Sequence, residues 1–284
     1  MELPFTIDLN GKVAVVTGGG GVLCAEMAAA LAASGAKIAV LDLNGDAAEK
    51  TAGNIRASGG SAIGVSANVL ERASLEAAGG RVLKELGPCD LLLNGAGGNH
   101  PQGTTSKEWF EPADRADKSL TTFFDLDPKG VEFVFNLNFL GTLLPTQAFA
   151  QQMIGRSGCS IINISSMNAF RPLTKIPAYS GAKAAINNFT QWLAVHFAKV
   201  GIRVNAIAPG FFLTAQNRSL LIDEATGQPT PRAQKIIDNT PMGRFGESRE
   251  LIGTLLWLAC AEASGFVNGV VVPIDGGFSA YSGV

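Results

Sequence analysis

Residues 12–24 read KVAVVTGGGGVLC, and this stretch decides the fold. Residues 12–17 form an apolar run of strand length, and the alanine- and leucine-rich segment from Val22 to Ser34 predicts a helix. Glycines between a strand and a helix let the main chain approach a pyrophosphate, whose charge the free N–H groups of the helix start favour. The stretch therefore predicts a phosphate-binding turn, formed by Gly18, Gly20, Gly21, Val22 and Leu23.

Further along the chain, short apolar runs alternate with longer helical patterns. The predicted strands are residues 37–42, 61–66, 89–94, 160–165, 202–208 and 269–273. The predicted helices are residues 45–57, 70–86, about 130–154, 178–200 and 247–261. This alternation is typical of an α/β fold with a doubly wound, Rossmann-like parallel sheet and helices on both faces. No repeat or linker interrupts it, so residues 1–284 are predicted to form a single domain.

Two irregular stretches, residues 98–130 and 210–240, follow the fourth and sixth predicted strands. In a doubly wound sheet, ligands bind beyond the carboxyl ends of the strands. Long loops at that edge are usually functional, so both stretches are predicted to be insertions on the rim of a binding site.

Composition excludes several classes of protein. The net charge is −2 without a basic run, which argues against nucleic acid or an anionic membrane as a partner. No apolar run is long enough to span a bilayer, and residues 1–5 do not begin a signal peptide. The 4 cysteines are widely spaced, which predicts buried thiols, no metal site and a cytoplasmic protein.

Several motifs occur in a fixed order along the chain. They are NGAG at residues 94–97, NFLG at 138–141, SIINISS at 160–166, YSGAK at 179–183 and PG at 209–210 with Thr214 after it. Together with the glycine turn, this set resembles the short-chain dehydrogenase/reductase family over nearly the whole chain. The resemblance implies an oxidoreductase with Ser166, Tyr179, Lys183 and Asn138 as catalytic residues.

The residue types suit the oxidation of an alcohol, which requires a proton to leave the hydroxyl as a hydride leaves the carbon. A phenol with a pKa of about 10 must be acidified by about 3 units to act as a base near neutrality. Lys183, one helical turn from Tyr179, is expected to lower the phenol's pKa. Ser166 is expected to hydrogen-bond the reacting oxygen. By the resemblance, Asn138 holds a water that links Lys183 to solvent.

Asp42 ends the second predicted strand, and a carboxylate there binds the ribose hydroxyls of NAD and repels the 2′-phosphate of NADP. NAD(H) is therefore expected in preference to NADP(H). The resemblance adds further cofactor-binding residues: Leu43, Asn68, Val69, Asn94, Ala96, Gly97, Pro209, Gly210, Phe212 and Thr214, together with Tyr179 and Lys183. Asn68 is expected to contact the adenine, although it is also read as an ordinary loop residue.

The chain departs from the family's motifs at three positions. The turn resembles TGxxxGxG, but Val22 and Cys24 stand where the pattern has its later glycines. Gly95 stands where the NNAG motif has its second asparagine. These changes leave open which N–H groups of the turn reach a phosphate.

The loops resemble those of family members that act on sugar acids, the D-mannonate oxidoreductases (fructuronate reductases). Polar and basic side chains near the reacting centre suit a polyol acid: Asn99, His100, Asn168, Arg171, Lys175 and Gln216. Arg171 and Lys175 are equally consistent with an exposed turn or a subunit contact, and His100 with an ordinary loop residue.

Two alternatives remain open on the sequence. In the first, the substrate is a different carbonyl compound, such as a gluconate-type keto acid or a 3-oxoacyl thioester. In the second, the protein binds a dinucleotide without catalysis.

The helices that carry Asn138 and Tyr179 are apolar on most faces, and the family commonly assembles through these helices. A homotetramer is therefore expected.

Overall fold

The computed structural model describes residues 6–214, 217–223 and 226–283. Within them a parallel sheet of 7 strands has the order β3-β2-β1-β4-β5-β6-β7. The strands are β1 Val13–Thr17, β2 Lys37–Asp42, β3 Ser61–Ser66, β4 Leu91–Asn94, β5 Cys159–Ile164, β6 Ile202–Pro209 and β7 Val271–Ile274. This topology confirms the predicted doubly wound sheet. The order reverses between β1 and β4, where such a sheet opens a crevice for ligands.

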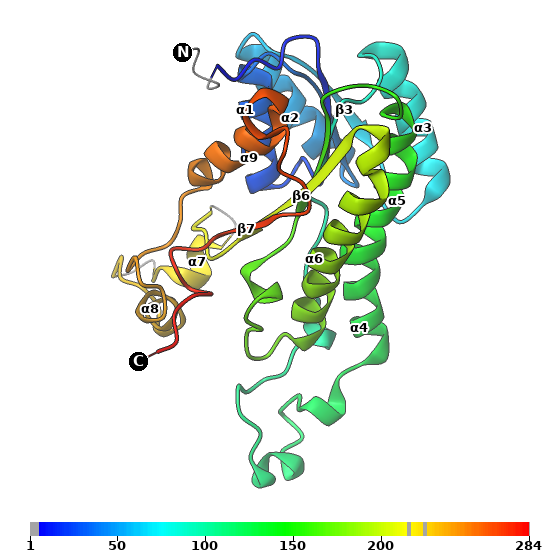
Figure 1. Cartoon of the computed structure of the whole chain (residues 1–284). Coiled ribbons are helices and arrows are strands. Elements are labelled where there is room, and N and C mark those ends of the chain that lie inside the picture. The colour runs from blue at the N-terminus through cyan, green and yellow to red at the C-terminus, as the bar shows by residue number, and fades with distance from the viewer. Residues whose placement is uncertain (1–5, 215–216, 224–225, 284) are drawn as a thin grey trace.

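Helices cover both faces of the sheet (Figure 1). One face packs against α1 Val22–Ala33, α2 Gly45–Ala57 and α9 Ile252–Ala259. The other packs against α3 Arg72–Glu85, α5 Gly141–Phe149 and α6 Pro177–Phe197, and α4 Pro128–Phe135 continues the line of α5 past the sheet. Strands β1, β4 and β6 are buried along their whole length because helices lie on both sides, which explains why β1 and β4 are almost entirely apolar.

The second rim stretch contains two helices that the sequence analysis did not predict, α7 Arg218–Leu221 and α8 Pro231–Asp238. Thr230 Oγ1 accepts a hydrogen bond from the N–H of Ala233 at 3.2 Å, and Pro231 occupies the first helical position. A threonine followed by a proline is a helix-start signal. The predicted helix over residues 247–261 is also interrupted, because Cys260 is extended between α9 and α10 Ala261–Ser264.

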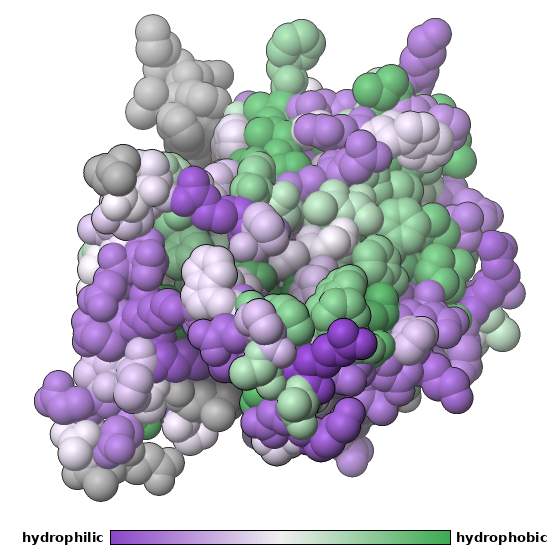
Figure 2. All heavy atoms as spheres, turned by 90° about the horizontal axis from the view of Figure 1, so that it is seen from below, coloured by the Kyte–Doolittle hydropathy of each residue, from purple (hydrophilic) through white to green (hydrophobic). Residues whose placement is uncertain are grey.

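The first rim stretch forms an arm that projects from the body, at the bottom of Figure 1. Its secondary structure is limited to short 3₁₀ turns at Pro101–Gly103, Pro112–Ala116 and Phe123–Asp125. Lys235 on α8 forms an ion pair with Glu108 of the arm at 2.5 Å, which joins the two rim stretches. Seen from below, this end of the molecule carries apolar side chains gathered between polar ones (Figure 2).

Across the described ranges, no helix is long and apolar enough to cross a membrane.

Candidate active site

Ser166, Tyr179 and Lys183 meet just beyond the carboxyl end of β5. Ser166 lies two residues after the end of the strand and caps a 3₁₀ turn, and the other two residues lie on the first turns of α6. The Ser166 hydroxyl is near enough to the phenol of Tyr179 to lower its pKa. Lys183 Nζ lies 5.7 Å from the centroid of the Tyr179 ring. The tyrosine and lysine of the YxxxK motif and the serine upstream of it therefore form one cluster.

Burial governs the protonation of this cluster. It raises the pKa of Tyr179 above its usual value, although the nearby Ser166 hydroxyl acts in the opposite direction. It lowers the pKa of Lys183 to about 8. Lys183 Nζ donates a hydrogen bond to the carbonyl oxygen of Ile164 at 2.7 Å. Desolvation of the phenolate thus opposes the acidification of Tyr179 that was expected from Lys183, and that acidification stays a prediction for the chain with its nicotinamide cofactor.

Asn138 lies at the centre of a turn of π-helix, Asn136–Leu140, between α4 and α5. Its fully buried side chain donates hydrogen bonds to the carbonyl oxygens of Gly98 and Val134, both at 2.7 Å. A Cβ atom on Gly97 would lie 2.7 Å from Asn138 Oδ1 and 3.3 Å from Lys183 Nζ. The segment after β4 therefore packs closely against both residues, and a side chain at position 97 would require Asn138 to shift.

The glycine turn joins the ends of β1 and β2. Gly21 is the N-cap of α1 and provides no capping side chain. The first N–H groups of that helix are left without a side-chain partner, and they are suited to an anion. The N–H of Gly20 donates to Asp42 Oδ2 at 3.0 Å, so the carboxylate lies directly beside the turn. Anion-binding groups and a diol-binding carboxylate are adjacent, as a dinucleotide requires.

Two predicted cofactor residues use their side chains elsewhere. Asn94 is buried, and its Nδ2 donates to Thr146 Oγ1 at 3.0 Å and Asn163 Oδ1 at 2.9 Å. This side chain ties β4 to α5 and β5, and its place beside the adenine ribose stays a prediction. Asn68 caps a turn, accepting from the N–H of Leu70 and donating to Glu71. Its contact with an adenine stays a prediction.

The segment after β6 is closely packed. A Cβ atom on Gly210 would lie 2.6 Å from the Cα of Asp275, so only glycine fits there. Asn217 fixes the following loop by accepting from the N–H of Thr214 and donating to the carbonyl oxygen of Phe212, both at 2.8 Å. Phe212 is buried, and Thr214 is half-buried beside it.

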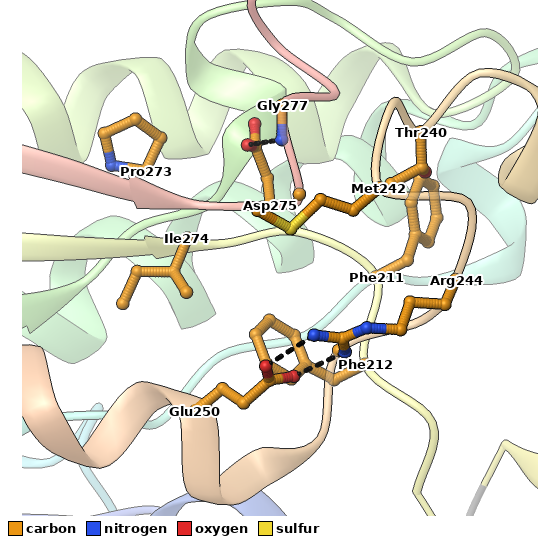
Figure 3. A pocket seen from close by; sticks show the side chains of 12 residues that line it. Phe211, Phe212, Thr240, Met242, Arg244, Glu250, Pro273, Ile274, Asp275 and Gly277 are labelled. Atoms are coloured by element: carbon orange, nitrogen blue, oxygen red, sulfur yellow. Dashed lines mark hydrogen bonds and ion pairs between the residues drawn. The ribbon is translucent and has the colours of Figure 1, made fainter.

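A cavity of about 370 Å³ lies at the ends of β6 and β7. Figure 3 shows the Arg244–Glu250 ion pair on one side of it and Asp275, bonded to the N–H of Gly277, on the other. Phe212 belongs to its wall, whereas Ser166, Tyr179 and Lys183 do not. The charged groups of the cavity are satisfied by one another or by the main chain, and the cavity is distinct from the cluster of Ser166, Tyr179 and Lys183.

The predicted substrate residues are only partly brought together. Asn168 is buried, donates its N–H to Ser166 Oγ at 3.3 Å, and has a side-chain oxygen without a hydrogen-bond partner. Arg171 is exposed and donates to the carbonyl oxygen of Tyr281 near the carboxyl end of the chain. Lys175 is exposed with a left-handed backbone. Gln216 lies outside the described residues.

Two of the predicted substrate residues in the first rim stretch have local partners. Asn99 donates to Thr104 Oγ1 at 3.0 Å, and His100 Nδ1 accepts from the N–H of Gln102 at 3.3 Å. The His100 ring also contacts Phe133, with ring centroids 5.1 Å apart. His100 thus begins a 3₁₀ turn and anchors it on α4, which favours the interpretation as a structural loop residue.

A family model of the short chain dehydrogenases matches residues 12–225. The chain is a short-chain dehydrogenase. As a member of this family of oxidoreductases it acts on CH–OH groups. The ordered motifs had indicated this family, and the match confirms it.

Three similar proteins indicate which members of the family this short-chain dehydrogenase resembles. An uncharacterized oxidoreductase of Haemophilus influenzae is 59% identical over 284 residues, which is 100% of this chain and 99% of the relative. A solved structure named "putative D-Mannonate oxidoreductase" from Haemophilus, with bound NAD, has a TM-score of 0.93 at 59% identity and covers 98% of both chains. The 2-dehydro-3-deoxy-D-gluconate 5-dehydrogenase of Escherichia coli K12 is 32% identical, covering 96% of this chain and 97% of its own.

Sequence reasoning missed one residue of this site in the short-chain dehydrogenase. Thr17, fully buried at the end of β1, accepts hydrogen bonds through Oγ1 from the N–H groups of Gly95 and Ala96, at 3.1 and 3.3 Å. It thereby fixes the segment after β4 to the start of the glycine turn. The available signal was a polar residue closing an otherwise apolar strand.

No group of three or more His, Cys, Asp or Glu side chains in the described part of the chain could hold a metal ion.

Proposed function

We propose that the protein is an NAD(H)-dependent oxidoreductase that interconverts a secondary alcohol and a ketone on a sugar acid, D-mannonate and D-fructuronate. The observation that carries the chemistry is the cluster of Ser166, Tyr179 and Lys183 beyond β5. The similarity to the NAD-bound Haemophilus structure supports the substrate and the cofactor. The free N–H groups of α1 and the Asp42 carboxylate fit a dinucleotide.

Each catalytic residue has a role that follows from its surroundings. Tyr179, whose pKa is raised by burial, stays protonated at neutral pH, which is the form that donates a proton to a ketone oxygen. Ser166 hydrogen-bonds the same oxygen as its charge develops. Lys183, with a pKa near 8, exchanges a proton close to neutrality. Asn138 holds the segment against which Lys183 packs. The cofactor, when bound, supplies or accepts the hydride.

The preference for NAD(H) rests on Asp42. Its Oδ2 accepts from Gly20 and its Oδ1 from Asn44, at 3.0 and 2.9 Å, so the carboxylate is held at one position beside the turn. A fixed negative charge there favours ribose hydroxyls and opposes a 2′-phosphate.

A polar substrate is favoured by Asn168. Its buried side-chain oxygen lacks a partner next to Ser166, and an unsatisfied buried acceptor is costly unless a donor reaches it. A substrate hydroxyl is such a donor, whereas a hydrocarbon surface is not. The 32% identical gluconate-type dehydrogenase is a further relative that acts on a sugar acid by its name.

A homotetramer that forms through α4, α5 and α6 belongs to the same proposal. Four large apolar side chains on α4 and α6 are exposed: Phe133, Phe135, Trp192 and Val195. Exposed apolar surface of this kind marks subunit contacts. A cytoplasmic location is favoured by the four cysteines, which are buried and free.

The test is a steady-state assay of NADH absorbance with D-mannonate and NAD, and with D-fructuronate and NADH. Parallel assays use NADP(H) and 2-dehydro-3-deoxy-D-gluconate with its reduced form. Turnover that prefers mannonate or fructuronate with NAD(H) supports the whole proposal. Turnover only with the gluconate-type pair replaces the substrate and keeps the chemistry. Absence of turnover with every sugar acid, despite NADH binding, rejects the substrate class.

A further inference from the structure

Cys24 and Gly95, two positions at which the motifs depart from the family pattern, meet in space. Cys24 lies on the first turn of α1, and its side chain is buried. A Cβ atom built on Gly95 would overlap the Sγ of Cys24, and it would also lie 2.8 Å from the carbonyl oxygen of Thr17. The thiol therefore occupies the space that any side chain at position 95 would need.

The segment that the thiol covers leads directly to the catalytic cluster. Gly95 and Ala96 are fixed from the β1 side by Thr17 Oγ1. A Cβ on Gly18 would lie 2.9 Å from the Cα of Ala96, so the glycine turn and this segment are in close contact. Gly97, the next residue, packs against Asn138 Oδ1 and Lys183 Nζ.

The thiol is chemically inert at this position. Burial raises the pKa of Cys24 to about 12, with Lys183 acting in the opposite direction and Asp42 adding to the rise. The group therefore stays a neutral thiol at any pH at which the enzyme operates. Its contribution is the volume that it fills beside Gly95.

We propose that Cys24 is a positioning residue whose thiol packs on Gly95 and holds residues 95–97 against the glycine turn, Asn138 and Lys183. Cys24 and Gly95 act as a matched pair, a larger residue on α1 with a glycine after β4. The inference rests on the proposed function only for its readout, since the packing itself belongs to the fold. Removing the thiol would loosen the segment, whose Gly97 packs against Lys183.

The experiment compares wild type, Cys24→Ala, Gly95→Ala and the double variant Gly95→Ala/Cys24→Ala, in which the Cβ of residue 24 would lie 3.6 Å from the new Cβ at position 95. The measurements are the NADH dissociation constant by fluorescence titration, the melting temperature and the pH profile of kcat. Cys260→Ala is the matched control, because that thiol is equally buried but lies at the end of α9.

Gly95→Ala is expected to weaken NADH binding at least about tenfold, because overpacking displaces the segment. Adding Cys24→Ala should recover at least about fivefold of that loss; the remaining approach to Thr17 keeps the recovery partial. Cys24→Ala alone should move the pH profile of kcat to higher pH, because a loosened segment leaves Lys183 less buried and so raises its pKa. Cys260→Ala should leave both quantities unchanged.

Equal NADH binding by Gly95→Ala and wild type, or an absence of recovery in the double variant, overturns the inference. If Gly95→Ala does not fold, an unmoved pH profile in Cys24→Ala overturns it instead. Wild-type protein that binds no NADH rejects the proposed function, and the melting temperatures of the four proteins then decide the packing question alone. A positive coupling between the two substitutions in melting temperature supports the matched pair.

Discussion

Lys183 Nζ donates a hydrogen bond of 2.7 Å to the carbonyl oxygen of Ile164, the last residue of β5. This bond anchors α6 to the end of the sheet and holds a buried amine beside the Tyr179 ring. A buried ammonium is costly, and desolvation lowers the pKa of Lys183 to about 8. The buried position in which this bond holds Lys183 therefore makes the cluster sensitive to pH.

The variant Lys183→Met should change how stability depends on pH. The pKa of Lys183 is about 8 in the folded chain and 10.5 without the fold, so above pH 8 the unfolded chain binds more protons. This residue therefore adds stability as the pH rises, by about 1 kcal/mol between pH 7 and pH 9. Lys183→Met should lack this rise. Its free energy of unfolding, measured with urea, should therefore fall relative to that of wild type between pH 7 and pH 9.

The interval ends at pH 9, because Cys24, Cys89 and Cys159 have raised pKa values in the folded chain and oppose the trend above it. Lys199→Met, which removes an exposed lysine, is the control and should follow wild type. Parallel curves for wild type and Lys183→Met would mean that Lys183 keeps an ordinary pKa.

Tyr179→Phe should lower kcat by about a thousandfold, because it removes the proton donor of the reaction. The ring and its packing are kept, so the NADH dissociation constant and the melting temperature should stay close to those of wild type. Tyr281→Phe is the matched control, since it removes the other tyrosine hydroxyl of the chain and should keep turnover. Turnover of Tyr179→Phe within tenfold of wild type would assign proton transfer to another group.

The parts of the fold that follow from local patterns were predictable. Patterns of neighbouring residues predict the apolar strands, the glycine turn and the YxxxK helix. The structure contains each of them within a few residues of the predicted bounds. The π-helical turn at Asn136–Leu140 was not predictable, because its apolar pattern is the same as that of an α-helix. Yet this turn is what places Asn138 opposite Gly97.

Side-chain partners distant in sequence were the other limit. Asn94 sits in a motif that suggests a ligand contact, but its partners Thr146 and Asn163 come from α5 and β5. Arg171 was predicted to bind a carboxylate, but in the fold it donates to the carbonyl oxygen of Tyr281 near the end of the chain. Neither set of hydrogen bonds can be predicted from the spacing of neighbouring residues, since both depend on how the elements pack.

Asn138→Ala should destabilise the protein by about 1 to 3 kcal/mol, because it leaves the buried carbonyl oxygens of Gly98 and Val134 without their donor. Turnover should fall as well, since the segment at Gly97 loses its contact beside Lys183. Asn239→Ala removes an exposed amide that donates to one carbonyl and should cost less than about 1 kcal/mol. Urea unfolding of both variants measures the difference, and equal losses would refute the structural role of Asn138.

Asp42→Asn should shift the cofactor preference from NAD toward NADP. The amide keeps the size of the side chain and an acceptor for the N–H of Gly20, but it removes the negative charge that opposes a 2′-phosphate. The ratio of kcat/KM for NAD to that for NADP should fall at least about tenfold, mainly through a lower KM for NADP. Asp46→Asn, an exposed carboxylate on the first turn of α2, is the control for net charge and should leave the ratio unchanged. A wild-type protein that uses NADP as well as NAD, or an Asp42→Asn variant with an unaltered ratio, would remove Asp42 as the origin of cofactor selectivity.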